Sequence, residues 1–450
     1  MTAAVLAFGT MATNGNAEEA SNGGHGNAPQ PFTTDSTSEC YRAVGRGIYD
    51  QETNRTYQVY LRDAVTPWII AYDHGKGEWS EPVRISSETY GVDDHFYPSM
   101  WINSRGYIHV VWGAHGSSFK HLATKEPYDI TSWEKLREIG RGCYAQPIAT
   151  DGGRVVYLFL TQYGPRRLVL YKSEDGGDTF GPQRPVIGPG YGGKGRGIYV
   201  GNIKHQPATD SGPEQFHIPW TFFHRDGSLH VGGRQHPVHY ALFNAETGRV
   251  YNAEGEDLGE SLKFPDGWEA TLVSQPRQEA QFMEYIPNTG VTKQGDPFVI
   301  WTELNAVTGE ERHTMFHTYF GIYNPDKEDW TVSKIHEEPL PQPGAVGRAY
   351  DVDVTDNGTI NMYFPTGKTV KLLTSEDSGQ TWEEQTIYRA PSLELESVYF
   401  AALIDSARMG SDAARHPDYQ LTFKQHFGPR SARGQSTAQF AWGEDGMLNP

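Results

Sequence analysis

The chain has 450 residues, of which only 37% are hydrophobic, and it contains 50 glycines, 28 prolines and 12% aromatic residues. This composition argues against a helical bundle and favours many short strands joined by turns, so we expect an all-β fold. A formal net charge of −18 argues against nucleic-acid binding and attachment to anionic membranes, and no stretch of the sequence is apolar enough to span a bilayer.

The first 33 residues are expected to lie outside the folded domain. Residues 2–13 form a short apolar run ending in Asn14-Gly15-Asn16-Ala17. This run resembles the end of a signal peptide, although the basic start of such a signal is missing and a disordered tail is the alternative. Residues 18–33 are rich in Gly, Asn, Ala and Pro, which is typical of a flexible linker. We therefore expect an export-signal remnant and linker over residues 1–33, one folded domain over residues 34–450, and a secreted protein.

Two segments are copies of one turn. Ser173–Phe180 and Ser375–Trp382 both match the pattern S-x-D-x-G-x-T-[FW]. In such a turn the Asp accepts hydrogen bonds from backbone N–H groups, the Gly adopts a positive φ, and the aromatic ring packs between sheets. Degenerate copies occur at residues 71–79, 123–133, 241–251 and 321–330, and residues 395–445 leave room for one further unit.

Glycine turns lie between these copies and indicate the strands of each unit. They occur at residues 104–106, 151–153, 226–228 and 356–358, and each precedes an apolar segment with strand character. A period of roughly 45 to 80 residues with four short strands per unit is typical of a β-propeller. Seven blades fit the sequence best. The two cysteines, Cys40 and Cys143, are expected to be unpaired, because two cysteines make neither a disulfide scaffold nor a four-ligand zinc site.

Four chemically active side chains occupy matching positions in the second and third units. When the two units are aligned, His95 falls opposite Tyr144 and His115 falls opposite Tyr163. The first strand of a propeller blade begins at the edge that the second strand reaches on its return. The four residues are therefore expected to gather on one face of the disc, beside the central funnel, where the alternative for each is an ordinary surface or packing role.

Such a cluster suits β-elimination from a uronic acid. This reaction requires neutralisation of the carboxylate, removal of the C5 proton and protonation of the departing O4. Histidine, with an ordinary pKa near 6.5, can act as a base or as a cationic partner, and tyrosine can exchange a proton. Arg166, Arg167 and Arg196, expected on loops of the same sector, are candidates for binding the carboxylate or a sulfate.

The strings Asp94-His95-Phe96-Tyr97-Pro98 and Gly113-Ala114-His115-Gly116, together with the repeated Asp turns, resemble the BNR-repeat polysaccharide lyases. The resemblance covers most of residues 40–390 and is greatest to ulvan lyases of the seven-bladed propeller type and to L-rhamnose-α-1,4-D-glucuronate lyases. It implies catalysis by His95, His115 and Tyr163 and neutralisation of the carboxylate by Arg196 or Arg166. Tyr144, which the alignment of the two units places beside them, is expected to bind substrate. The implied partner is an acidic polysaccharide containing rhamnose-α-1,4-glucuronate, and no cofactor is needed for the chemistry.

The sequence leaves several alternatives open. Some members of the family carry a structural zinc or calcium ion, and here five histidines that match no tight ligand motif crowd one unit: His205, His217, His224, His236 and His239. A sialidase would share the Asp turns, but the F/Y-R-I-P string of that family is absent. A lyase acting on rhamnose-capped side chains and a non-catalytic glycan-binding propeller are the other readings. A monomer is expected.

Overall fold

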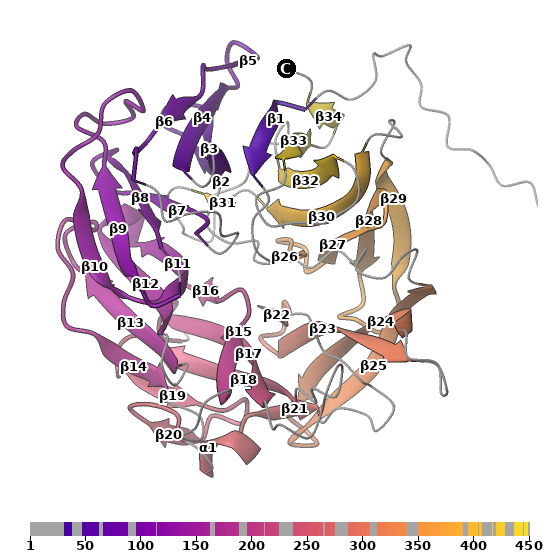
Figure 1. Cartoon of the computed structure of the whole chain (residues 1–450). Helices are drawn as coiled ribbons and strands as arrows, with labels where there is room; N and C mark the ends of the chain where they lie inside the picture. Colours follow the sequence, from indigo (N-terminus) through magenta and orange to yellow (C-terminus); the bar gives the residue numbers. More distant parts are fainter. Residues whose placement is uncertain are drawn as a thin grey trace, which may run out of the picture.

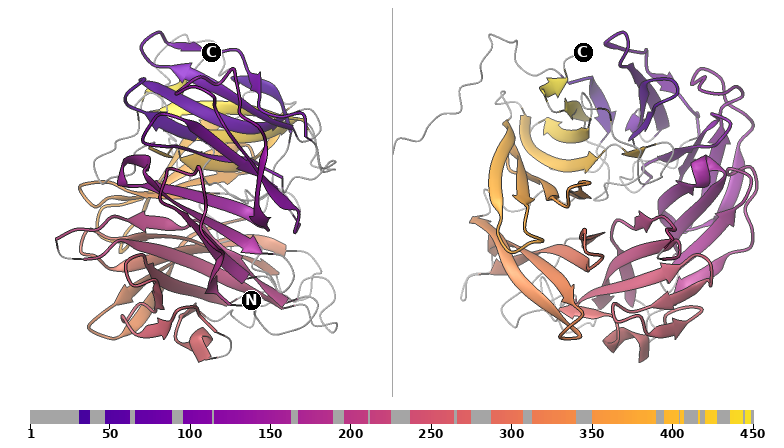
Figure 2. Two further views of the ribbon diagram at one scale, coloured as in Figure 1. Left: turned by 90° about the vertical axis from the view of Figure 1, so that its left-hand side faces the viewer. Right: turned by 180° about the vertical axis from the view of Figure 1, so that it is seen from behind.

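The computed structural model describes residues 31–37, 47–62, 66–88, 96–113, 115–162, 167–188, 196–210, 212–224, 237–263, 266–274, 287–306, 313–339, 350–389, 395–403, 405–406, 416, 420–427, 436–443 and 445–448. In these residues the fold is an all-β propeller, with sheets arranged around a central axis (Figures 1 and 2). The one α-helix described, α1 (Asp266–Glu269), has four residues, and no described helix could cross a membrane.

Five sheets form separate blades. The first consists of β7 (Ser99–Ile102), β8 (Ile108–Trp112), β9 (Ser118–Ala123) and β10 (Arg137–Arg141). The second consists of β11 (Cys143–Thr150), β12 (Val155–Gln162), β13 (Arg167–Ser173) and β14 (Arg184–Ile187), with the short helix η1 (Asp151–Gly153) between β11 and β12. The third consists of β15 (Arg196–Val200), β16 (Lys204–Gln206), β17 (Gln215–His224), β18 (Val238–Asn244), β19 (Arg249–Tyr251), β20 (Asp257–Gly259) and β21 (Leu272–Ser274). The fourth consists of β22 (Asn288–Val291), β23 (Pro297–Ala306), β24 (His313–Asn324) and β25 (Asp329–Pro339). The fifth consists of β26 (Asp351–Val354), β27 (Ile360–Thr366), β28 (Thr369–Ser375) and β29 (Glu383–Arg389).

The sixth sheet has eleven strands and joins the two ends of the chain. Its N-terminal part consists of β1 (Thr33–Thr37), β2 (Gly47–Asp50), β3 (Arg55–Arg62), β4 (Thr66–Asp73), β5 (Glu78–Trp79) and β6 (Val83–Arg84). Its C-terminal part consists of β30 (Leu395–Leu403), β31 (Asp405–Ser406), β32 (Leu421–Phe427), β33 (Ser436–Gly443) and β34 (Gly446–Leu448).

The prediction of seven separate blades is wrong. The first and last units of the sequence do not form blades of their own, because β1 pairs with β33 on one side and with β3 on the other. A parallel pairing of β2 with β31 adds a second link between the two units. Backbone hydrogen bonds therefore continue from one end of the chain to the other, and strands from both termini share one sheet.

The two good copies of the Asp turn have the same hydrogen bonds. The Asp175 Oδ1 accepts a bond from the Thr179 N–H at 2.9 Å, and the Asp377 Oδ1 accepts one from the Thr381 N–H at 2.8 Å. The Thr381 bonds hold the pKa of Asp377 at about 2. Each turn joins the third strand of a blade to the fourth, as do the degenerate copies after β4, β9, β18 and β24.

The two good copies of the Asp turn also pack on an aromatic ring of the preceding blade. A Cβ on Gly379, which has a φ of +87°, would lie 2.1 Å from a ring carbon of Phe320, and a Cβ on Gly177 would lie 2.5 Å from Trp101. The glycine therefore has two reasons to be there, the positive φ and the closeness of the ring. The same arrangement at two places shows how the repeat joins neighbouring blades.

Gly379→Ala should lower the free energy of unfolding by about 3 kcal/mol, because the added methyl group meets a buried ring and the residue must keep a positive φ. Gly152→Ala is the matched control, since Gly152 has a φ of +61° but nothing within 4 Å of the added atom. That control should cost only about 1 kcal/mol. Denaturant unfolding of both variants measures the difference, and equal losses would mean that the ring contact contributes nothing.

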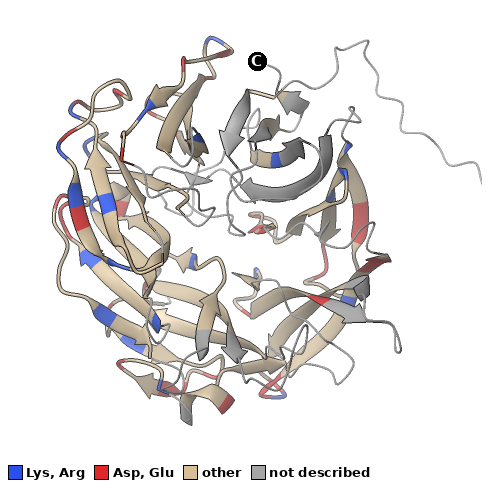
Figure 3. Ribbon diagram, in the orientation of Figure 1, with Lys and Arg blue, Asp and Glu red and all other residues tan. Residues whose placement is uncertain are grey.

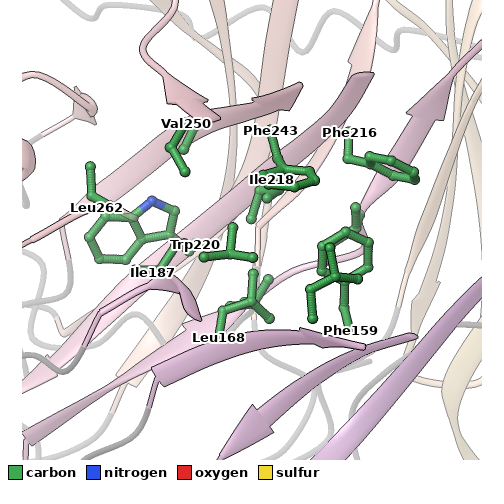
Figure 4. Packing of buried hydrophobic residues seen from close by; sticks show 14 of the residues in the cluster. Phe159, Leu168, Ile187, Phe216, Ile218, Trp220, Phe243, Val250 and Leu262 are labelled. Atoms are coloured by element: carbon green, nitrogen blue, oxygen red, sulfur yellow. The ribbon is translucent and has the colours of Figure 1, made fainter. Parts of the chain in front are cut away.

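The core lies between neighbouring blades. Phe159 and Leu168 of the second blade meet Phe216, Ile218 and Phe243 of the third in one buried cluster (Figure 4). Burying each such side chain stabilises the fold by about 2 kcal/mol. Because these contacts are made face to face between sheets, the inner edge of each sheet is left to line the central axis. Figure 1 shows β7, β11, β16, β22 and β26 closest to that axis.

Candidate functional site

The first strands of three successive blades begin at one edge of the disc. Ser99 at the start of β7 pairs with Val111, Cys143 at the start of β11 pairs with Thr161, and Arg196 at the start of β15 pairs with His224. The second strands β8, β12 and β17 therefore end at the edge where β7, β11 and β15 begin, as the sequence predicted. We call this edge the site rim.

His115 lies on the site rim, in the turn that joins β8 to β9. Its side chain is exposed and its backbone adopts a φ of 50°, in the left-handed region that non-glycine residues seldom occupy. Gly113 and Gly116 on either side also have positive φ values, so the turn is tight and projects the imidazole from the rim. An unusual backbone conformation of this kind is a feature of functional sites.

Tyr144 also lies at the site rim, but in a different environment from the one predicted. Its φ is 61°, and the register between β11 and β12 shifts between Cys143 and Gln146, which is a bulge in the strand. Tyr144 is 4% exposed. Its ring lies between those of Tyr97 and Tyr199, with distances between ring centroids of 6.3 Å and 6.5 Å. These three rings form an aromatic wall across three blades, and the burial of Tyr144 favours a role in shaping that wall over direct contact with a sugar.

The remaining predicted site residues are less completely described. His95, Tyr163 and Arg166 lie outside the described residues. Arg196 is the first residue of β15, and its side chain is also outside them. The expectation that Arg167 and Arg196 lie on loops is wrong, because Arg167 pairs with Gln162 at the start of β13 and Arg196 pairs with His224. Regular strand pairing thus extends to the site rim.

Sequence reasoning missed two members of the aromatic wall and one arginine. Tyr97 belongs to the string that contains His95, so its position was a usable signal. Tyr199 has no comparable signal, because its contact with Tyr144 depends on how two blades are placed. Arg141 ends β10 and precedes Tyr144 by three residues, and only the short connection between β10 and β11 shows that it lies at the rim.

A polar network lies around the axis and links three inner edges. The Asp351 Oδ1 accepts hydrogen bonds from the Lys204 Nζ at 2.9 Å, the Asn202 Nδ2 at 3.3 Å and the Asn288 Nδ2 at 3.4 Å. Asp351 is 3% exposed, so the ammonium and the two amides replace the water that its carboxylate would otherwise bind. The third, fourth and fifth blades are thereby held together near the axis.

Asp351→Ala should lower the free energy of unfolding by about 2–4 kcal/mol, because it leaves an ammonium and two amide groups without their common acceptor. Asp351→Asn is the control that keeps an acceptor oxygen and removes the charge, and it should cost less. Thermal unfolding of both variants checks this expectation. Equal melting temperatures for Asp351→Ala and the wild-type protein would contradict it.

The described histidines of the third blade do not form a metal site. His205 contacts Glu214 at 2.9 Å, the His217 Nδ1 lies 2.5 Å from the Tyr240 hydroxyl, and the His239 Nδ1 lies 3.2 Å from the Thr271 hydroxyl. Among the described residues, no group of three or more His, Cys, Asp or Glu side chains could hold a metal ion. His236 and the side chain of His224 are outside this part of the chain. Cys143 is buried and its thiol donates to the Thr161 carbonyl at 3.4 Å, whereas Cys40 is not among the described residues.

Known proteins resemble the chain in sequence and in fold. The family model of a BNR repeat-containing family member matches residues 55–338. An ulvan lyase PL25 of Pseudoalteromonas sp. (strain PLSV) is 28% identical over 311 residues, which cover 58% of this chain and 58% of that protein. An ulvan lyase of Alteromonas sp. (strain LOR) is 29% identical over 252 residues, which cover 45% of this chain and 47% of that protein. The matched region thus spans about half the length of these relatives.

The fold is similar to a solved structure over nearly the whole chain. The structure of a PL25 ulvan lyase bound to -[GlcA(1-4)Rha3S]- superposes with a TM-score of 0.71 and 22% identity, covering 93% of this chain and 96% of that one. At this level of identity the match shows the propeller fold alone.

Proposed function

Because the chain belongs to the BNR repeat-containing family, we propose that it is a polysaccharide lyase that cleaves rhamnose-α-1,4-glucuronate linkages by β-elimination. The proposed substrate is an acidic polymer such as ulvan, the substrate named for two relatives of this sequence. The observation that carries the proposal is the site rim, where the exposed His115 turn lies at the same edge as the starts of β7, β11 and β15. In the sequence, His95 shortly precedes β7, Tyr163 directly follows β12, and Arg196 is the first residue of β15.

The proposed mechanism divides the elimination among these residues. Arg196 or Arg166 binds the uronate carboxylate and neutralises it, which makes the C5 proton more acidic. A base among His95, His115 and Tyr163 removes that proton. The electron pair of the C5–H bond forms the C4–C5 double bond, the C4–O4 bond breaks, and O4 takes a proton from an acid of the same cluster. The aromatic wall of Tyr97, Tyr144 and Tyr199 supports the strands that hold this cluster.

The proposed setting of the enzyme follows from the same considerations. We propose a secreted monomer whose partner is the polysaccharide, without nucleic acid or membrane partners. The net charge of −18 supports the exclusion of nucleic acid and anionic membranes, because a strongly acidic protein repels them. An acidic polysaccharide would be attracted only to a local cationic site. The elimination uses protein side chains. A structural zinc or calcium ion remains a prediction, which metal analysis of the purified protein tests.

The test is incubation with ulvan and, separately, with a rhamnose-capped arabinogalactan, followed by ultraviolet absorbance and mass spectrometry. Products that carry a 4,5-unsaturated uronate at the new non-reducing end are expected from ulvan. Activity on the capped polymer alone would assign the enzyme to terminal side chains. Products heavier by one water per cut would show hydrolysis, and binding without any cleavage would favour a glycan-binding propeller.

A further inference from the structure

We propose that Arg141 and Arg167 form an anion-binding subsite on the site rim, which holds a sulfate ester or a second carboxylate of the polysaccharide beside the cleaved linkage. The inference rests on the proposed function to the extent that an acidic polysaccharide crosses this rim. It adds a pair of residues that positions the polymer and does not take part in proton transfer.

The side chain of Arg167 is held in place by a chain of hydrogen bonds. Its Nε donates to the Gln162 Oε1 at 2.5 Å, and the Gln162 Nε2 donates to the Gln183 Oε1 at 2.9 Å. The Tyr171 hydroxyl donates to the same Gln183 oxygen at 2.9 Å. Because Gln162 engages Nε, the guanidinium is oriented, and no described residue accepts a hydrogen bond from its two terminal nitrogens.

Arg141 lies between the His115 turn and the end of β12. The next residue, Gly142, donates its N–H to the Ser117 carbonyl at 3.3 Å, and a Cβ on Gly142 would lie 2.9 Å from the Thr161 carbonyl oxygen. Gly142 therefore contacts the segment after His115 on one side and the end of β12 on the other, where the proposed catalytic residues lie. The exposed Arg141 directly precedes Gly142.

The two arginines are also linked through the interior of the rim. A Cβ on Gly140 would lie 2.1 Å from the Tyr171 hydroxyl oxygen, so β10 packs directly against the ring that supports Gln183. The contacts therefore run from Gly140 through Tyr171, Gln183 and Gln162 to Arg167. These contacts fix the Arg167 side chain relative to β10, the strand that carries Arg141.

Among the described residues, neither arginine forms a hydrogen-bonded ion pair with a carboxylate, although the protein is strongly acidic. Glu138, in the same strand as Arg141, forms its ion pair with Lys120, which is the main cause of the lowered pKa of this carboxyl, and Arg141 adds the smallest contribution to that shift. Figure 3 shows both basic and acidic residues on these blades. Most other described surface arginines form ion pairs: Arg55 with Asp73, Arg105 with Asp178, Arg137 with Glu134, Arg154 with Asp151 and Arg249 with Asp257.

The chemistry of the guanidinium identifies the ligand. Its fork of N–H donors matches the oxygens of a sulfate or a carboxylate, and such charge-assisted bonds are roughly twice as strong as neutral ones. Two such groups on one edge of an otherwise acidic protein would attract a polyanion to that edge and orient it. Both anionic groups of a sulfated uronic-acid polymer have this chemistry.

The test compares Arg141→Gln, Arg167→Gln and the double variant with Arg154→Gln, using ulvan and chemically desulfated ulvan. Arg154 is the matched control, because it lies on the same blade after η1, at the opposite edge, and is paired with Asp151. Each single variant should raise KM for ulvan about 10-fold while kcat changes by less than about 3-fold, as expected for loss of a charge-assisted contact that does not change in the transition state. Arg154→Gln should change neither constant.

The two polymers identify the source of the anion. If the KM penalty disappears on desulfated ulvan, the subsite binds the sulfate ester, and if the penalty persists, it binds a carboxylate. Arg167→Lys keeps the charge without the fork and should fall between wild type and Arg167→Gln. A KM for both glutamine variants equal to that of Arg154→Gln, or a loss in kcat alone, would overturn the subsite.

A binding measurement separates this inference from the proposed function. Calorimetry with ulvan fragments should show tighter binding by the wild-type protein than by the double variant, whether or not cleavage occurs. Weaker binding by the double variant in a protein that makes no unsaturated product would keep the subsite and reject the lyase. Cleavage with equal binding would keep the lyase and reject the subsite.

Discussion

Tyr163→Phe and His115→Asn should each lower kcat on ulvan by about 10²–10⁴-fold, because positioned proton transfer contributes about that much to a rate. Tyr163→Phe deletes one hydroxyl and keeps the ring. Asparagine is preferred to alanine at residue 115, since the backbone there has a φ of 50° and asparagine tolerates the left-handed region. Initial rates of absorbance increase from the unsaturated product measure both effects.

Stability provides the control for this pair of variants. His115 is exposed, and exposed substitutions usually change the free energy of unfolding by less than about 0.5 kcal/mol, so the melting temperature of His115→Asn should hardly move. Tyr199→Phe, on the neighbouring inner strand, should keep kcat within a few-fold. If Tyr163→Phe turns over normally while His115→Asn is inactive, histidine carries the proton. Normal turnover by both would remove the proposed catalytic cluster.

The second large effect is on stability in acid, where the free energy of unfolding should fall steeply below about pH 6.5. Four histidines are buried, each at most 4% exposed: His109, His121, His217 and His239. Burial lowers the pKa of His121, His217 and His239 to about 3, and burial together with neighbouring His121 holds that of His109 well below its usual value. The folded protein therefore keeps all four imidazoles neutral in mild acid.

The direction of the effect follows from which state binds protons. The unfolded chain protonates these histidines near pH 6.5, whereas the folded protein does not protonate them until much lower pH. Their contribution is fully present above pH 6.5 and is lost as the pH falls toward the folded values. Each histidine costs about 1.4 kcal/mol per pH unit in that range, so four can cost up to about 5 kcal/mol per unit. A domain stable by about 5–15 kcal/mol should therefore unfold between about pH 5.5 and about pH 4, at the higher pH if its stability is at the low end of that range.

Urea unfolding between pH 7.5 and 5 measures this slope. His239→Phe should reduce the slope by about one proton, because the imidazole is stacked on Trp220 at 4.1 Å and a phenyl ring can take its place. Tolerance of the substitution can be judged at pH 7.5, where the histidine is neutral in both states. A wild-type slope near zero between pH 6 and 5 would contradict the expected burial of neutral histidines.

The repeat architecture could be predicted from sequence because its signals are local. An Asp, a Gly and a Thr at fixed spacing make a turn whose bonds involve only its own residues, and the structure has those bonds at both Asp175 and Asp377. The number of separate blades could not be predicted in the same way. It depends on whether β1 pairs with one neighbour or two, and backbone pairing between chain ends leaves no pattern in the residues.

The candidate site could be predicted only in outline. Strand polarity places His115 and Tyr144 on the same rim from sequence alone, since it needs only the turn positions. The burial of Tyr144 could not be foreseen, because it depends on a bulge in β11 and on Tyr97 and Tyr199 from two other blades. The hydrogen bonds that orient Arg167 involve glutamines 21 residues apart in the sequence, which no local motif connects.

The position of β1 has a consequence for how the chain reaches its folded state. One edge of β3 and one edge of β33 stay unpaired until β1 (residues 33–37) lies between these two strands. Yet β3 and β33 are separated by almost the entire sequence. Loop closure over such a span is entropically costly and slow, and sheets dominated by distant pairings fold late. During synthesis the N-terminal strand must wait for the last strands to leave the ribosome. Until then two unpaired sheet edges are open to other chains, so the greatest risk of aggregation falls before closure and not after it.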